Sequence, residues 1–142
     1  MSMFYEEEIS CPKCEHKQKM KIWQSLNVTD NTTLRERLFN AEINVFKCES
    51  CGNKAFLAVP LLYNDVKRKF CVQFYPYDSL TQKTFWDLFT IDGKFKIKKL
   101  SENAAESGNY LLEPHIVFDL DEMLRYIHFR EKLYDRLAKK KW

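Results

Sequence analysis

The chain has 142 residues and a formal net charge of +3, with 45% hydrophobic and 30% charged residues. These values are typical of one compact domain, or one domain with an appended lobe, and exclude a largely disordered chain. The small net charge also gives little support for non-specific nucleic-acid binding, which depends on many phosphate contacts. No apolar run approaches the roughly 20 residues that cross a bilayer, and the N-terminal segment is acidic where a signal peptide would be basic. We therefore expect a cytoplasmic protein with no membrane partner.

Alternating apolar residues predict a largely extended first half. Residues 20–28 alternate apolar and polar positions, apart from Trp23, and predict a long strand. Thr33 and Glu36 have the spacing of a capping box, which predicts a short helix ending near residue 40. A further strand is expected over residues 42–47.

A hairpin is predicted next. Residues 55–63 are apolar but contain Pro60, which favours an edge strand or a bulge. Residues 63–69, which end in three basic side chains, predict a turn, and residues 70–75 alternate as the returning strand.

The second half is expected to combine strands with one long helix. Asp92-Gly93 is a preferred two-residue turn and predicts a hairpin between residues 85–91 and 94–100. Residues 101–109 are polar and predict a loop, and residues 110–118 predict an extended segment.

Asp119 and Glu122 have the spacing of helix-capping residues, and a helix is expected from there to about Lys139. Its apolar positions cover more than half of the circumference, which favours packing against a sheet and one further element. That element belongs either to this chain or to a second copy. The apolar positions are Leu120, Met123, Leu124, Tyr126, Ile127, Phe129, Leu133, Tyr134 and Leu137.

These elements predict an α+β protein. Residues 8–78, which contain two Cys-x-x-Cys pairs, would form a zinc-ribbon-like lobe with antiparallel β-hairpins and a short inserted helix. Residues 79–142 would form an α+β C-terminal part, with a hairpin, a strand and a long helix that packs on the sheet. We expect the two parts to pack together.

Four of the five cysteines form two Cys-x-x-Cys pairs, and these predict a metal site. They are Cys11, Cys14, Cys48 and Cys51. Two residues between cysteines allow a tight turn that places both sulfurs at adjacent corners of a tetrahedron. The gap of 33 residues exceeds the usual 15 to 20, but loop closure adds only about 0.6 kcal/mol per doubling of length. Structural zinc contributes on the order of 10–16 kcal/mol. One structural Zn²⁺ is the leading interpretation, ahead of iron.

Other roles for the cysteines and the nearby histidine stay open. Disulfides would require secretion, and a redox Cys-x-x-Cys is usually found at a helix N-terminus, whereas Cys14 precedes a strand-like segment. Gly52 is expected to supply the positive φ of the second turn. His16 is close enough in sequence to replace a ligand, and Cys71 is expected to be an inert buried thiol.

Two further groups of polar residues suggest alternative functions. An enzymatic centre would combine acidic and imidazole groups of the C-terminal half, although cap and surface roles explain them more simply. This group is His115, Asp119, Asp121, Glu122 and His128. Basic clusters at residues 67–69, 94–99 and 139–141 are candidate phosphate-binding sites or solvated surface.

The chain resembles the CpXC domain family of bacterial proteins in four segments. These are Cys11-Pro12-Lys13-Cys14, Leu26-Asn27-Val28-Thr29, Cys48-Glu49-Ser50-Cys51-Gly52 and Leu61-Leu62-Tyr63-Asn64-Asp65. The resemblance is clearest over residues 9–76, weaker over residues 116–131, and implies a cytoplasmic zinc-binding domain without an assigned activity. It carries the four ligand positions to Cys11, Cys14, Cys48 and Cys51. Glu49 stands where the family often has Pro, and Glu15 where such turns often have Gly.

The first functional hypothesis is a non-enzymatic module for protein interaction, self-association or assembly, stabilised by zinc. The alternatives are an enzyme with its site around His115, Glu122 and His128, a nucleic-acid-binding zinc ribbon that uses residues 67–69, and a thiol–disulfide redox protein.

Overall fold

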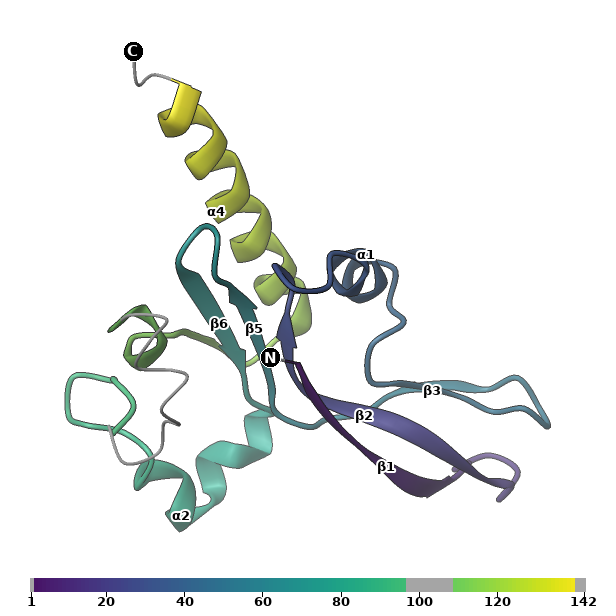
Figure 1. Cartoon of the computed structure of the whole chain (residues 1–142). Coiled ribbons are helices and arrows are strands. Elements are labelled where there is room, and N and C mark those ends of the chain that lie inside the picture. The colour runs from purple at the N-terminus through teal and green to yellow at the C-terminus, as the bar shows by residue number, and fades with distance from the viewer. Residues whose placement is uncertain (1, 97–108, 140–142) are drawn as a thin grey trace.

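The computed structural model describes residues 2–96 and 109–139. Its elements confirm the α+β class (Figure 1). In chain order they are β1 (Met3–Ser10), β2 (Lys17–Asn27), α1 (Thr33–Phe39), β3 (Val45–Lys47), β4 (Lys54–Phe56), β5 (Leu61–Asp65), β6 (Phe70–Phe74), η1 (Tyr77–Thr81), α2 (Lys83–Trp86), η3 (Asn109–Leu112), β7 (His115–Val117) and α4 (Leu120–Lys139).

Five strands form one mixed sheet in the order β1-β2-β5-β6-β7, and β3 and β4 form a separate antiparallel pair. The β1–β2 and β5–β6 pairs are antiparallel hairpins, whereas β2–β5 and β6–β7 are parallel pairs. β7 thus joins the sheet built by the first half of the chain. A division of the chain near residue 78 stays a prediction.

The main core lies between this sheet and the helices α1 and α4. Val72 and Phe74 of β6 pack with Met123 and Ile127 of α4, and each of these side chains is at most 4% exposed. Burial of one such side chain contributes about 1.5–3 kcal/mol. Tyr75, the residue after β6, contacts the ring of Phe85 with centroids 4.8 Å apart. Side chains therefore pack closely around β6, whereas β1 at the other end of the sheet is largely exposed.

The long helix is confirmed, and only its first half lies over the sheet. It begins after Asp119, whose Oδ1 accepts a 2.7 Å hydrogen bond from the amide of Asp121. Phe129 and Leu137 are 55% and 57% exposed, and Figure 1 shows the far end of α4 extending past β5 and β6. Burial within the chain therefore accounts for one part of the apolar surface and leaves the other uncovered. No helix among the described residues is both long and apolar enough to cross a bilayer.

Strand β1 was not predicted, because its sequence lacks alternation of apolar and polar residues. All but one of its eight side chains are exposed. Its pairing is supported by opposite charges across the strands, Glu6 with Lys21 and Glu8 with Lys19.

Three local predictions need correction in the first half of the chain. The helix at residues 33–39 is present, but Thr33 is its first residue rather than its cap, and its amide donates to Asn31 Oδ1. Residues 63–65 lie in β5, so the turn comprises residues 66–69. The apolar stretch around Pro60 is divided between β4 and β5, which belong to different sheets.

A turn is present at Asp92-Gly93 as expected, and Gly93 has φ +82°. In the described part of the expected hairpin, which ends at residue 96, an antiparallel bridge joins Phe89 to Phe95. At the start of the first expected strand Lys83–Trp86 form a short helix, and the ring of Phe85 packs against Tyr75. Residues 97–108, which include most of the second expected strand and the expected loop, lie outside the described residues. The segment at residues 110–118 is only partly extended, because η3 occupies its start.

Candidate metal centre

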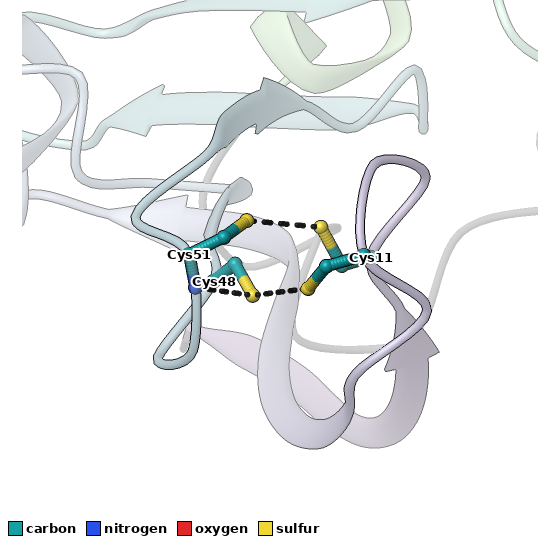
Figure 2. A group of neighbouring side chains, drawn as sticks. Cys11, Cys48 and Cys51 are labelled. Atoms are coloured by element: carbon teal, nitrogen blue, oxygen red, sulfur yellow. Dashed lines mark hydrogen bonds between the residues drawn. The ribbon is translucent and has the colours of Figure 1, made fainter.

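The four cysteines lie at the ends of two hairpins. Cys11 and Cys14 lie in the turn between β1 and β2, and Cys48 and Cys51 lie in the turn between β3 and β4. Helix α1 is inserted between β2 and β3, which explains the long gap between the cysteine pairs. Figure 2 shows the two turns facing one another, with their sulfur atoms directed into the space between them.

Both turns have the same backbone hydrogen bonds. The amides of Cys11 and Cys48 donate to the carbonyls five residues later, each at 2.8 Å. The carbonyls of Cys11 and Cys48 accept hydrogen bonds from the amides four residues later, each at 2.9 Å. That fourth residue has positive φ in both turns, Glu15 at 65° and Gly52 at 76°. The prediction for Gly52 is confirmed, and Glu15 adopts a conformation that L side chains disfavour.

The sulfur positions fit a tetrahedral ion. Cys11 Sγ lies 3.7 Å from Cys51 Sγ, and Cys14 Sγ lies 3.5 Å from Cys48 Sγ. All four sulfurs lie within 4.8 Å of one another. Tetrahedral zinc with Zn–S distances of about 2.3 Å requires sulfurs about 3.8 Å apart, whereas a disulfide requires about 2.05 Å. The cluster can therefore hold a metal ion of this size.

Hydrogen bonds and burial shift the pKa values of Cys11, Cys14 and Cys48 in different directions. Burial raises the pKa of Cys11, but hydrogen bonds from backbone amides and neighbouring thiols together outweigh it and bring the pKa to about 6. The amide of Cys51 is the largest effect on Cys48 and lowers its pKa. At Cys14 the amide of His16 lowers the pKa, but burial and the other sulfurs raise it to about 12. Four thiolates this close require a cation to be stable together.

The centre has its own small core. Cys11 and Cys48, one from each turn, are buried with Phe46, and partly buried hydrophobic side chains pack around them. Cys14 and Cys51 are exposed. The site therefore has one pair of sulfurs toward the protein and one pair toward solvent.

Two amide side chains that the sequence analysis missed connect the hairpins. Gln18 of β2 donates to the carbonyl of Lys47 and accepts from the amide of Glu49, both at 2.9 Å. Asn44 is buried with φ 55°, and its side chain bonds both the amide and the carbonyl of Trp23, at 2.7 and 3.0 Å. In the sequence, the preference of Asn for positive φ was the one signal that could have indicated the role of Asn44.

The other candidate ligands and thiols lie outside the cluster. The group of metal-binding side chains among the described residues consists of the four cysteines and does not include His16, which is exposed. Cys71 is buried as expected, and burial raises its pKa to about 12. Its thiol donates to the carbonyl of Tyr110 at 3.5 Å.

The structure does not bring together the histidines of the alternative enzymatic centre. His115 stacks on the ring of Tyr126, with centroids 3.8 Å apart, beside Arg130 and Cys71. His128 lines a different pocket, next to Glu131 and Lys67. The acidic groups at the start of α4 include Asp119, which caps the helix.

The fold and the site together define an α+β protein in which four cysteines between two hairpins form a cluster that can hold a metal ion. The family model described as CpXC protein matches residues 9–139, and the chain belongs to that family. No curated protein matches the chain, and no solved structure does.

Proposed function

We propose that this CpXC protein is a cytoplasmic zinc-binding protein whose single Zn²⁺ is structural, and that it acts as a module for protein interaction or assembly. The observation that carries the proposal is the closed set of four sulfurs within 4.8 Å of one another. Four thiolates fill a tetrahedral shell and leave no position for a substrate or a reactive water. When bound, the ion would supply charge compensation and a cross-link between the two hairpins.

Hydrogen bonds within the chain orient the sulfur atoms for this cross-link without a bound ion. The amide of Lys13 donates to Cys11 Sγ and the amide of Cys51 to Cys48 Sγ, both at 3.4 Å. Such hydrogen bonds favour the thiolate form, which is the form that ligates a metal. Gln18 holds the second turn against β2. These contacts support a rigid, permanent centre.

The uncovered part of α4 supports the interaction role. Phe129, Leu133 and Leu137 recur at four-residue spacing, so they share one side of the helix, and each is at least 38% exposed. Three exposed apolar side chains along one side of an otherwise charged helix are typical of a surface that packs against another protein. The partner is either a second copy of this chain or another protein.

The metal role is tested by replacing Cys48 with Ala and measuring bound zinc by elemental analysis and unfolding by circular dichroism. We expect the variant to lose zinc and the single cooperative unfolding transition. A fully folded variant without metal would contradict the structural role. Two disulfides in place of metal in the purified chain would favour the redox alternative.

The interaction role is tested on the zinc-loaded chain by sedimentation velocity over a range of concentrations. The doubly substituted variant Leu133→Gln with Leu137→Gln is expected to abolish concentration-dependent association, whereas Arg136→Gln on the same helix should leave it intact. Equal association of all three proteins would exclude this side of α4 as the contact surface. A chain that stays monomeric throughout would exclude self-association.

A further inference from the structure

A second polar site lies away from the metal centre. It is a pocket of about 430 Å³ between α1, the turn after β5 and the middle of α4. Two ion pairs line it. The guanidinium of Arg35 donates to both carboxylate oxygens of Glu131, at 2.6 and 2.8 Å, and Arg68 donates to Asp65 Oδ2 at 2.9 Å. The first pair joins α1 to α4, and the second joins the end of β5 to the turn that follows it.

Two hydrogen-bond donors in the lining have no acceptor. The hydroxyl of Tyr63 and the Nε of Arg68 are both buried, without a partner in the part of the chain that the structure describes. Tyr63 is 0% exposed. Burial is the main reason why its pKa is raised, and the nearby charges that act on it include Glu131 and Asp65. Buried donors without acceptors are rare because they are energetically unfavourable.

Carboxylates and cationic side chains are equally numerous in the lining, and each guanidinium lies next to two carboxylates. Arg35 pairs with Glu131 and Glu36, while Arg68 pairs with Asp65 and lies 4.0 Å from Asp135. Lys67 and Lys132 also line the pocket, and neither forms an ion pair with any residue that the structure describes. The exposed imidazole of His128 lies in the same lining.

We propose that this pocket binds a small molecule that carries a phosphate group. The phosphate oxygens accept hydrogen bonds from Tyr63 Oη and Arg68 Nε, and Lys67 and Lys132 attract the phosphate because neither lysine is paired with a carboxylate of the lining. A phosphate provides several acceptors and a double negative charge, which match two unsatisfied donors and two free ammonium groups. A single water occupies about 30 Å³, so the pocket has room for a phosphate and an organic group of the size of a sugar.

The test uses the zinc-loaded full chain, with inorganic phosphate and ribose 5-phosphate as probes. The readouts are calorimetric titration and the thermal midpoint, each compared with chloride at equal ionic strength and with ribose alone. Phosphate and ribose 5-phosphate should both raise the midpoint, with ribose 5-phosphate binding more tightly. A phosphate response no larger than that of chloride would overturn the proposal.

The Tyr63→Phe variant separates ligand binding from a structural role. It removes a hydroxyl that has no partner, so the free protein should keep or raise its thermal midpoint, while phosphate affinity falls roughly tenfold. A lowered midpoint with an unchanged phosphate response would mean that the hydroxyl serves a buried water only, and would overturn the proposal.

The charge contribution is tested with Lys67→Ala and Lys132→Ala, both at exposed positions. Each should weaken phosphate several-fold and reduce the salt dependence of binding. Lys83→Ala on α2, which removes the same charge away from the pocket, is the matched control and should bind as the parent does. Binding of a single-stranded oligonucleotide without binding of ribose 5-phosphate would contradict a small-molecule site.

Discussion

The sheet and the metal centre are held together by different physical means. Among the described residues, fourteen buried hydrophobic side chains form the main core, whereas the core of the metal centre has only Cys11, Phe46 and Cys48. Three buried side chains offset only a small part of the conformational entropy of ordering two hairpins, at about 1–2 kcal/mol per residue. The comparison leads us to predict that a bound ion replaces hydrophobic burial in the region of the cysteines and that the main core is independent of it.

Removal of the metal is the strongest way to separate the two regions. A structural zinc contributes on the order of 10–16 kcal/mol, so chelation should unfold residues 9–20 and 44–57 while β5, β6 and α4 stay folded. Amide hydrogen exchange measured by mass spectrometry before and after chelation provides the test. Equal loss of protection in both regions would show that they unfold as one unit.

A cavity in the main core should have the opposite effect to chelation: it should destabilise the sheet and leave the cysteine cluster unchanged. Ile127 is 0% exposed, and Ile127→Ala should lower the free energy of unfolding by about 2–5 kcal/mol without changing the zinc content. Phe129→Ala on the same helix is the control, because Phe129 is 55% exposed and should change stability by less than about 0.5 kcal/mol. Urea unfolding and elemental analysis measure the two properties. Loss of zinc from the Ile127 variant would contradict independent regions.

The residue that joins the regions should affect both. Asn44→Ala leaves the buried amide and carbonyl of Trp23 without partners, and should destabilise the chain by about 1–3 kcal/mol. Asn44→Asp keeps the acceptor but buries a carboxylate whose second oxygen faces the carbonyl of Trp23, so its destabilisation should be at least as large. Urea unfolding and competition with a zinc chelator would test this, and a change in only one of them would assign Asn44 to one region.

The two turns of the centre provide the most sensitive comparison, because their backbones match and their fourth residues differ. A Cβ at Gly52 would meet nothing within 4 Å, so Gly52→Ala should cost only the conformational penalty, about 1–2 kcal/mol. Glu15→Gly should make the free energy of zinc binding more favourable by up to about 1 kcal/mol, because it relieves the same backbone strain. Competition with a chelator measures both, and a shift of the same sign in both variants would contradict this account.

The sequence was sufficient for features whose signals are local. The cysteine spacing predicted two turns that would meet, and the position of Gly52 predicted its backbone conformation. The apolar pattern of the last helix predicted its length and the burial of Met123 and Ile127. Each of these depends on chemistry within a few residues or on a strong periodicity.

What was missed depends on partners far away in the chain. β1 pairs with β2, whose lysines lie opposite its glutamates, and its own residue pattern does not indicate a strand. Gln18 and Asn44 act through side-chain amides whose targets are 21 to 31 residues distant. The segment at residues 83–86 is helical over only four residues, too few for an apolar periodicity to indicate it, and its Phe85 contacts Tyr75.

The strand order of the large sheet has a consequence for synthesis on the ribosome. Its strands lie side by side in the order in which they are translated, so each can pair with the edge left by the strand before it. All four cysteines of the cluster precede β5. Arg35 of α1, in contrast, contacts Glu131 of α4, which is translated 96 residues later. Domains generally fold as the chain emerges. A nascent chain stalled before residue 115 would therefore carry a finished metal centre beside an uncovered apolar sheet, which is the kind of surface that chaperones bind.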